Sequence, residues 1–480
     1  MSLPAPGLFW LTRDFRFADN PALLAALRDG PLLAVFFVDR LTRAQGAASR
    51  WRLGRALAQF DAALRRRTGG QGVVVLHDEA DIALPVLARR FGSRQIHQSD
   101  WPAPDMRALQ DRVRRALDPA GAELVLHPGH LLTHPQALRT GSGGVYRVYT
   151  PFARALRTHG PERPAPDAPD RITAFAMPPD SQDPAGIDLA PDLHRGRAVL
   201  ERFALPAGEA AAHDRLTAFL EQAAPYPADR DRPDLDATSG LSEHLALGEI
   251  SPRQLWSIAR FHAEIHPDQA PGIEKFLSEV IWREFAWHLL IDCPSLPQAC
   301  WRQDWDDFPW HPAGPGLTHW QRAETGMALV DAGLREMWVT GRMHNRVRMV
   351  VASWLTKHLL TDWRAGLAHF TDCLTDWDPA ANAMNWQWVA GCGPDATPFF
   401  RIFNPQRQAE QYDPEGRYRR RWLAGFMGAP GPEAQAWLDS VPTGWGSAST
   451  WQPGPPSALT EGRARALDAL ARFRSAQTKD

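Results

Sequence analysis

The sequence contains few cysteines and no long apolar run. Its four cysteines include no C-x-x-C pair, so neither a zinc site, an iron–sulfur cluster nor a disulfide framework is predicted, and we interpret them as buried thiols. No segment approaches the roughly 18 apolar residues of a membrane-spanning helix. The start, Met-Ser-Leu-Pro, lacks the basic and apolar regions of a secretory signal. These absences predict a cytoplasmic protein with neither a metal nor a membrane partner.

Common nucleotide-binding fingerprints are also missing. No G-x-G-x-x-G follows the first predicted strand, and there is no P-loop. The net charge is only −2, which argues against a protein that coats nucleic acids generally. Only three of the 53 basic residues are lysine. The planar fork of the arginine side chain suits phosphate binding. A GC-rich genome would also produce such an excess of arginine over lysine.

The first part of the chain alternates short apolar runs with helical patterns, which predicts a parallel sheet with helices on both faces. The predicted strands are 8–11, 32–38, 73–76, 95–97 and 123–126. The predicted helices are 21–28, 48–67, 82–91 and 105–117. Asn20 before Pro21 is a good N-cap, and Gly69 is a suitable helix end.

A proline-rich segment and a helical region follow. Prolines at 161, 164, 166, 169, 178, 179 and 184 predict an extended linker over the surface. Helical periodicity then dominates, at 215–220, 252–262, 272–290, 328–338, 343–360 and 463–474. The predicted fold is an α/β domain (1–135) of Rossmann-like type, a linker (136–205) and an all-α domain (206–480).

One stretch, 362–405, concentrates polar and aromatic residues. It holds four tryptophans, the acidic pair Asp376 and Asp378, and the carboxamide of Asn382. Taken singly, each residue fits an aromatic-rich helix corner with capping aspartates. Together they predict a planar ligand, because Asp-x-Asp can cap a helix and accept hydrogen bonds, while Asn382 offers both a donor and an acceptor.

This stretch resembles the flavin-binding core of the photolyase/cryptochrome family, with most similarity to microbial cyclobutane pyrimidine dimer photolyases. The matching pieces are D-W-R-x-G, D-x-D-x-A-x-N, W-Q-W and F-R-I-F-N-P, in the family's order and spacing. The opening W-x-x-R-D-x-R-x-x-D-N-P-A-L resembles the start of the family's antenna domain. Pro104-Asp105 stands where folate-binding relatives place Asn-Glu, so a folate antenna, a deazaflavin antenna and no antenna all remain open.

The resemblance implies a monomeric, two-domain flavoprotein that is a light-driven carbon–carbon lyase. Reduced FAD would donate an electron to a cyclobutane pyrimidine dimer in UV-damaged DNA, and the electron would return after the ring splits. The alternatives are a cryptochrome-like blue-light receptor without repair, and a flavin-binding relative without a light function.

The resemblance also implies a set of FAD-binding residues. They are Tyr226, Thr238, Ser239, Gly240, Leu241, Ser242, Phe276, Asn345, Arg348, Asp376, Trp377, Asp378 and Asn382. Arg348 should pair with Asp376 beside the isoalloxazine ring, and Asn382 should lie near N5. Hydroxyls and backbone N–H groups of the loop 238–242 can hold a pyrophosphate, or the loop can be an ordinary Ser/Thr-capped one. Gly240 stands where relatives often carry a basic residue, which removes one phosphate contact.

A second set is implied for the DNA lesion. It comprises Arg230, Glu279, Trp282, Arg283, Asn345, Arg346, Met349, Trp388, Arg401 and Gln408. An indole stacks on a flipped base and a carboxylate binds its edge, whereas the alternative for Trp282 is a core residue. Arg342 replaces a common aromatic residue of the lesion pocket, and Gln411 replaces a lysine of some relatives. The arginine-rich run 417–421 either contacts DNA phosphates or forms a solvent-exposed charged face.

Three tryptophans match the family's electron relay. Trp386, Trp363 and Trp310 would carry charge between the flavin and solvent, and the alternative is three core or surface aromatics. With Glu279 and Asn382, they form the predicted catalytic set.

Overall fold

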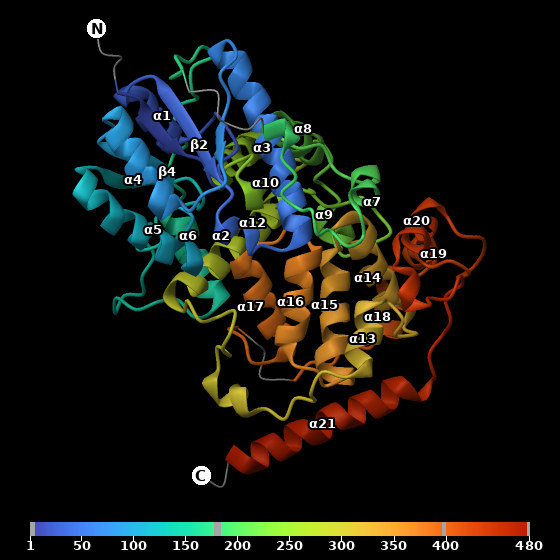
Figure 1. The fold of residues 1–480 in the computed structure, drawn as a ribbon. Coiled ribbons are helices and arrows are strands. Elements are labelled where there is room, and N and C mark those ends of the chain that lie inside the picture. Colours follow the sequence, from blue (N-terminus) through green and yellow to red (C-terminus); the bar gives the residue numbers. More distant parts are fainter. Residues whose placement is uncertain (1–4, 177–183, 396–399, 478–480) are drawn as a thin grey trace. The chain divides into compact units, whose positions relative to one another are not determined.

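The computed structural model describes residues 5–176, 184–395 and 400–477 (Figure 1). Contacts divide the chain into two interleaved units. Unit 1 comprises Met1–Pro191, Pro206–Tyr226 and Ser239–Pro294, and unit 2 comprises Asp192–Leu205, Pro227–Thr238 and Ser295–Asp480. Pro178 and Pro179 lie outside the described residues. The domain boundaries at 135 and 205 stay a prediction.

Unit 1 contains the predicted parallel sheet. Its strands are β1 (Gly7–Trp10), β2 (Leu32–Phe37), β3 (Val74–Leu76), β4 (Gln95–Ser99) and β5 (Glu123–His127), in the order β3-β2-β1-β4-β5. All four neighbouring pairs are parallel, with Leu8 opposite both Leu33 and Ile96. Every residue of β1 and β2 is buried, as expected for a sheet with both faces covered. All five predicted strands are confirmed.

Helices cover this sheet and continue beyond it. They are α1 (Pro21–Asp29), α2 (Arg40–Arg43), α3 (Ala47–Thr68), α4 (Ala80–Phe91), α5 (Pro104–Leu117), α6 (Tyr149–His159), α8 (Glu209–Leu220), α10 (Ser242–Leu247), α11 (Pro252–Ile265) and α12 (Ala270–Asp292). The predicted caps are confirmed: Asn20 accepts a hydrogen bond from the Leu23 N–H, and Gly69 ends α3 in the left-handed conformation. Phe9, Phe36 and Val75 share one core with residues of α1 and α3.

Buried ion pairs link the sheet region of unit 1 to its later helices. Arg52 of α3 lies 2.9 Å from Glu243 and 2.6 Å from Glu249, and Arg253 lies 2.8 Å from Asp19. Burial alone would raise the pKa of Glu249, but Arg52 and the His244 hydrogen bond lower it to about 2. Breaking such a buried pair leaves an uncompensated charge, so these contacts hold α10 and α11 to the first 60 residues.

The proline-rich segment also contributes to unit 1. Ala168 and Ile172 are buried in the core that contains Phe9, and Leu32 exchanges backbone hydrogen bonds with Thr173 and Phe175. This described part of the predicted surface linker is therefore packed against the start of β2.

Unit 2 is helical in its described residues, apart from an isolated bridge between His311 and Thr361. Its helices are α7 (Arg197–Arg202), α13 (Pro315–Gln321), α14 (Ala328–Thr340), α15 (Asn345–Ser353), α16 (Trp363–Cys373), α17 (Pro379–Ala390), α18 (Pro405–Tyr412), α19 (Arg417–Trp422), α20 (Pro432–Ser440) and α21 (Ser457–Gln477). The short helix α9 (Tyr226–Asp229) begins at the last residue of a unit 1 segment.

One helix predicted in unit 2 is divided into two elements in the structure. The segment predicted as one helix, 343–360, is α15 followed by the π-helical turn η4 (Trp354–His358).

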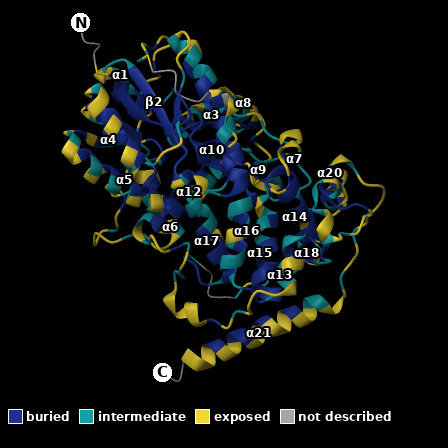
Figure 2. Cartoon of the chain, in the orientation of Figure 1, coloured by how far each residue is buried: buried dark blue, intermediate teal, exposed yellow. Residues whose placement is uncertain are grey.

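The terminal helix α21 is exposed along much of its length (Figure 2), but its buried residues include Gly462, Ala466 and Phe473. A Cβ at Gly462 would lie 2.9 Å from the Cβ of His358, so a small residue is needed where α21 meets η4.

Among the described residues, no helix is long and apolar enough to cross a bilayer.

Candidate functional site

The corner between α16 and α17 contains several side-chain hydrogen bonds. Asp378 is the N-cap of α17 and accepts a hydrogen bond from the Ala381 N–H at 2.8 Å, with Pro379 in the first turn. One turn further, Asn382 Nδ2 donates to the Leu367 carbonyl at 3.2 Å and to Thr371 Oγ1 at 3.1 Å. Both amide hydrogens are used within the protein, so the half-buried side chain offers its oxygen to a ligand as an acceptor.

The predicted ion pair between α15 and this corner is present. Arg348 Nη2 lies 2.8 Å from Asp376 Oδ2, and its Nε donates to the Met343 carbonyl at 2.7 Å. Asn345 is exposed and Met349 is half-buried, whereas Val350 and Val351 are fully buried. The polar residues and the core residues of α15 therefore lie on different faces of the helix.

The other predicted basic contacts of unit 2 form two groups. Arg346 is 2.6 Å from Asp231 and lies over the Tyr412 ring at 4.4 Å, and Arg230 is 3.8 Å from the same carboxylate. Arg401 is exposed, with its guanidinium 5.9 Å from the Trp388 ring centroid.

Gln408 is half-buried on α18, and its Oε1 is enclosed without a hydrogen-bond partner. Arg342 donates to the Phe203 carbonyl at 3.1 Å.

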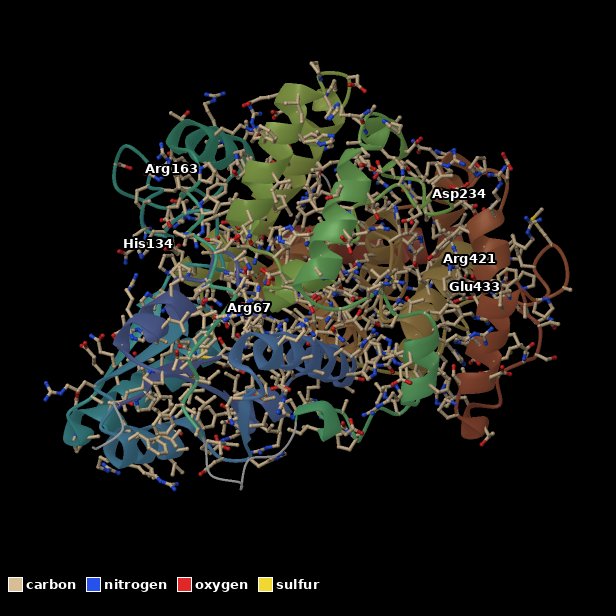
Figure 3. The ribbon with its side chains drawn as sticks, turned by 90° about the horizontal axis from the view of Figure 1, so that it is seen from above. Arg67, His134, Arg163, Asp234, Arg421 and Glu433 are labelled. Atoms are coloured by element: carbon tan, nitrogen blue, oxygen red, sulfur yellow. The ribbon has the colours of Figure 1, made fainter. Side chains whose placement is uncertain are left out.

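The arginine run at 417–421 is largely neutralised within unit 2. Arg421 of α19 lies beside Glu433 of α20 at 2.9 Å (Figure 3). Arg419 lies 2.9 Å from Asp413, and Arg417 lies 2.6 Å from Glu415. These pairs favour the solvated-face interpretation of the run over a set of phosphate contacts.

The predicted relay tryptophans have indole nitrogens that are buried without a hydrogen-bond partner. Trp386 packs on α16, where a Cβ at Gly366 would lie 2.1 Å from its Cη2. Gly366 is one turn after Trp363, which is fully buried. Trp310 is half-buried, with its ring 4.5 Å from that of Phe308.

Trp320 was not predicted from the sequence, and its ring centroid lies 6.2 Å from that of Trp386 at an angle of 71°. It carries no motif that would distinguish it among 20 tryptophans.

In unit 1, α12 carries the predicted lesion residues. The Trp282 ring stacks on Tyr149 with centroids 3.6 Å apart and planes 1° apart, and Tyr149 donates a hydrogen bond to the Ser278 carbonyl at 2.9 Å. Tyr149 was not predicted, because it lies 133 residues before Trp282 in the sequence. One face of the indole is thus covered by protein.

The charged residues of α12 have different partners. Glu279 pairs with Lys275, one turn earlier, at 3.0 Å. Arg283 lies 2.8 Å from Glu284 and 3.0 Å from His130 Nε2. Glu284 also accepts from the Leu132 N–H at 2.7 Å, and burial lowers the pKa of His130 well below its ordinary value, with Arg283 adding to the effect. These contacts with protein groups give Glu284 a structural role.

Two predicted cofactor residues of unit 1 form an aromatic cluster. Phe276 and Tyr226 are both buried, their ring centroids are 6.4 Å apart, and Phe219 lies 4.7 Å from Phe276.

The polar loop begins with Thr238 at the end of a unit 2 segment and continues in unit 1. Leu241 is buried and anchors the loop, while Ser239 and Gly240 are half-buried and Ser242 is exposed. Arg215 of α8 donates from Nε to the Ser239 carbonyl at 2.6 Å. This arginine was not predicted from the sequence.

Comparisons with known proteins show which proteins the chain resembles. Residues 7–170 match the family model described as DNA photolyase, and residues 276–469 match the FAD binding domain of DNA photolyase. The deoxyribodipyrimidine photo-lyase of Agrobacterium fabrum is 40% identical over 422 residues, which cover 87% of each chain. The crystal structure of a bacterial class III photolyase from Agrobacterium tumefaciens superposes with a TM-score of 0.84 at 36% identity, covering 98% of each chain.

A cryptochrome from Synechocystis shares the fold, with a TM-score of 0.82, 24% identity and coverage of 98% of this chain and 100% of its own. The matched family models and the identity to curated relatives extend over most of the sequence. The chain therefore belongs to the DNA photolyase family.

Proposed function

We propose that this chain repairs UV-damaged DNA in light, by splitting cyclobutane pyrimidine dimers. The FAD-binding family model and relatives named deoxyribodipyrimidine photo-lyase support this function. Reduced FAD, when bound and excited by light, supplies the electron that opens the cyclobutane ring. The electron returns to the flavin after the ring has split. The protein binds, orients and shields the reactants.

The observation that carries the proposal is the polar corner of unit 2. A flavin ring offers hydrogen-bonding groups along one edge, and this corner presents the Asn382 oxygen and the Arg348–Asp376 pair from adjacent elements. The residues present thus fit a flavin. The FAD-binding set implied by the resemblance also includes Trp377, Asp378, Asn345, Tyr226, Phe276 and the loop 238–242.

The lesion would be recognised mainly by stacking. Trp282 has one face against Tyr149, so a pyrimidine stacks on its other face, and Trp388 supplies a second indole beside Arg401. Base stacking on an aromatic side chain contributes about 1–3 kcal/mol. Glu279, Arg283, Asn345 and Met349 contact the dimer, while Arg230, Arg346, Arg401 and Gln408 bind the DNA around it.

The tryptophan relay serves a separate step, the light-driven reduction of oxidised cofactor. Trp386 is the inner donor, Trp363 the middle one and Trp310 the outer one. Indoles suit this role because their rings are readily oxidised, and the close packing of Trp386 on α16 fixes the first member.

The second candidate is a blue-light receptor without repair. The Synechocystis cryptochrome supports only a shared fold, because its identity is 24%. A monomeric state, a cytoplasmic location and an antenna chromophore remain predictions.

The test is illumination of the purified, reduced protein with an oligonucleotide that contains one dimer. We expect dimer loss that requires light, and the controls are a dark sample and a Trp282→Ala variant. Retention of every dimer in light, with FAD bound, would refute repair and favour the receptor.

A further inference from the structure

The segment 124–161 of unit 1 carries charge of one sign. It contains four arginines and no aspartate or glutamate, in a chain whose net charge is −2. The arginines are Arg139, Arg147, Arg154 and Arg157, and all four are exposed. In the described part of the chain only Arg157 among them forms an ion pair. Residues 139–157, which we call the basic arm, therefore concentrate positive charge on the surface of unit 1.

Two contacts hold the first half of the basic arm against α12. The Tyr146 N–H donates to His288 Nε2 at 3.1 Å, and the Tyr149 ring stacks on Trp282. Burial lowers the pKa of His288 to about 4, and the charge of Arg139 adds to the effect. His288 is therefore neutral at pH 7 and accepts the hydrogen bond, and Arg139 lies near the same end of α12.

Arg147 lies close to the predicted lesion tryptophan. Val148, between Arg147 and Tyr149, is extended with φ −131° and ψ 135°. At about 3.3 Å per extended residue, the Cα atoms of Arg147 and Tyr149 are about 7 Å apart. Because Tyr149 covers one face of Trp282, a phosphate next to a base stacked on the indole is within reach of the Arg147 guanidinium.

The carboxylates of α12 leave most of this charge uncompensated. Glu274 is shared by Arg157, at 3.1 Å, and by Arg260 of α11, so two guanidiniums face one carboxylate. Glu279 and Glu284 each pair with a basic residue of α12 itself. The basic arm therefore keeps an excess of positive charge beside the helix that carries Trp282.

We propose that the basic arm binds the phosphate backbone of the damaged DNA strand, through Arg139, Arg147 and Arg154. This inference rests on the proposed function, in which a pyrimidine stacks on Trp282, and assigns further DNA-binding residues to it. The arm follows α12 from residue 288 to residue 274, about 21 Å at 1.5 Å per residue, which matches about six phosphates of one DNA strand. Phosphate contacts fix the position of the strand without reading bases, so the arm holds damaged and undamaged DNA alike.

The experiment measures the affinity of the FAD-containing full chain for a fluorescent single-stranded oligonucleotide, with and without one dimer, at several salt concentrations. We expect the triple variant Arg139→Ala, Arg147→Ala, Arg154→Ala to weaken binding of both DNAs about tenfold or more at low salt. The slope of log affinity against log salt should fall by about 0.7 for each arginine that contacts a phosphate. With saturating DNA, dimer loss in light should equal that of wild type, because the arm does not take part in the reaction.

A second triple variant is the matched control. Arg89→Ala, Arg94→Ala, Arg115→Ala removes three exposed arginines of unit 1 outside the arm and changes the net charge equally. It should leave the affinity and the salt slope close to those of wild type.

Single variants at position 147 test the role of charge. Arg147→Lys should keep most of the affinity, because lysine binds phosphate as a point charge. Arg147→Glu should weaken binding more than Arg147→Ala.

Unchanged affinity in the arm variant, or a loss equal to that of the control, would overturn the inference. So would a loss confined to dimer-containing DNA, because phosphate contacts do not distinguish the lesion. Wild-type protein that repairs dimers while the arm variant binds DNA normally would refute the arm alone, whereas wild type that binds neither DNA would overturn the proposed function as well. Thermal unfolding and flavin content check that each variant is folded.

Discussion

Replacement of Asn382 by aspartate tests both the geometry and the proposed role of this residue. The amide nitrogen donates to the Leu367 carbonyl at 3.2 Å and to Thr371 Oγ1 at 3.1 Å, and Thr371 itself donates to the same carbonyl at 2.9 Å. An ionised aspartate has no donor, so one carboxylate oxygen would face the Leu367 carbonyl.

The expected cost follows from these two contacts. Each hydrogen bond contributes about 0.5–1.5 kcal/mol, so the free energy of unfolding of Asn382→Asp should fall by about 1–3 kcal/mol at neutral pH. A protonated carboxyl can donate one of the lost bonds, so the fold raises the pKa of the new aspartate. Between the unfolded and folded pKa values the native state binds more protons, and stability therefore falls as pH rises through this range.

Urea unfolding of wild type and Asn382→Asp from acidic to neutral pH measures this difference. Thr371→Val is the matched control, because it removes one acceptor without adding a charge. In Asn382→Asp, photoreduction should accumulate a different flavin redox state than in wild type, since a carboxylate replaces the acceptor oxygen of the amide. Unchanged stability across this range, with unchanged photoreduction spectra, would show that Asn382 does not lie where we place it.

Three further predictions concern the relay, the DNA contacts and a buried lysine. Trp386→Phe should abolish photoreduction of oxidised flavin while chemically reduced protein still repairs dimers; normal photoreduction would exclude Trp386 as the sole first donor. Trp388→Ala should weaken binding of dimer-containing DNA by about 1–3 kcal/mol and spare undamaged DNA, whereas Arg401→Ala should weaken both and reduce the salt dependence; equal effects of the two variants on the two DNAs would contradict the assignment. Lys357 is fully buried, its Nζ donates to the Ala390 carbonyl, and burial lowers its pKa well below the ordinary value. Between the folded and unfolded pKa values of Lys357, the native state therefore binds fewer protons than the unfolded chain. The free energy of unfolding of wild type should rise with pH in this range by up to about 1.4 kcal/mol per pH unit. Urea unfolding at alkaline pH measures this slope, which Lys357→Met should lack.

Much of the fold and part of the site could be predicted from the sequence, because both depend on near neighbours. Strand and helix positions follow from the spacing of apolar residues. Caps such as Asn20 and Asp378 accept hydrogen bonds from backbone N–H groups only three residues away. The Arg348–Asp376 pair was predicted by resemblance and is present.

Other parts were decided only by tertiary packing. Arg215 lies beside Gly240, Tyr149 stacks on Trp282, and Trp320 contacts Trp386, across separations of 25, 133 and 66 residues. No local period connects such residues, because their meeting depends on how whole helices pack.

The interleaving of the two units has the same origin. Residues 239–294 belong with the sheet region because Arg52 and Asp19 find their buried partners there, although the sequence pattern of that segment is simply helical. Apolar spacing and local motifs were enough to predict the helices, the strands and the family. The tertiary structure decided which charges and rings complete the site, since burying a charge or fixing a ring requires partners that distant segments supply.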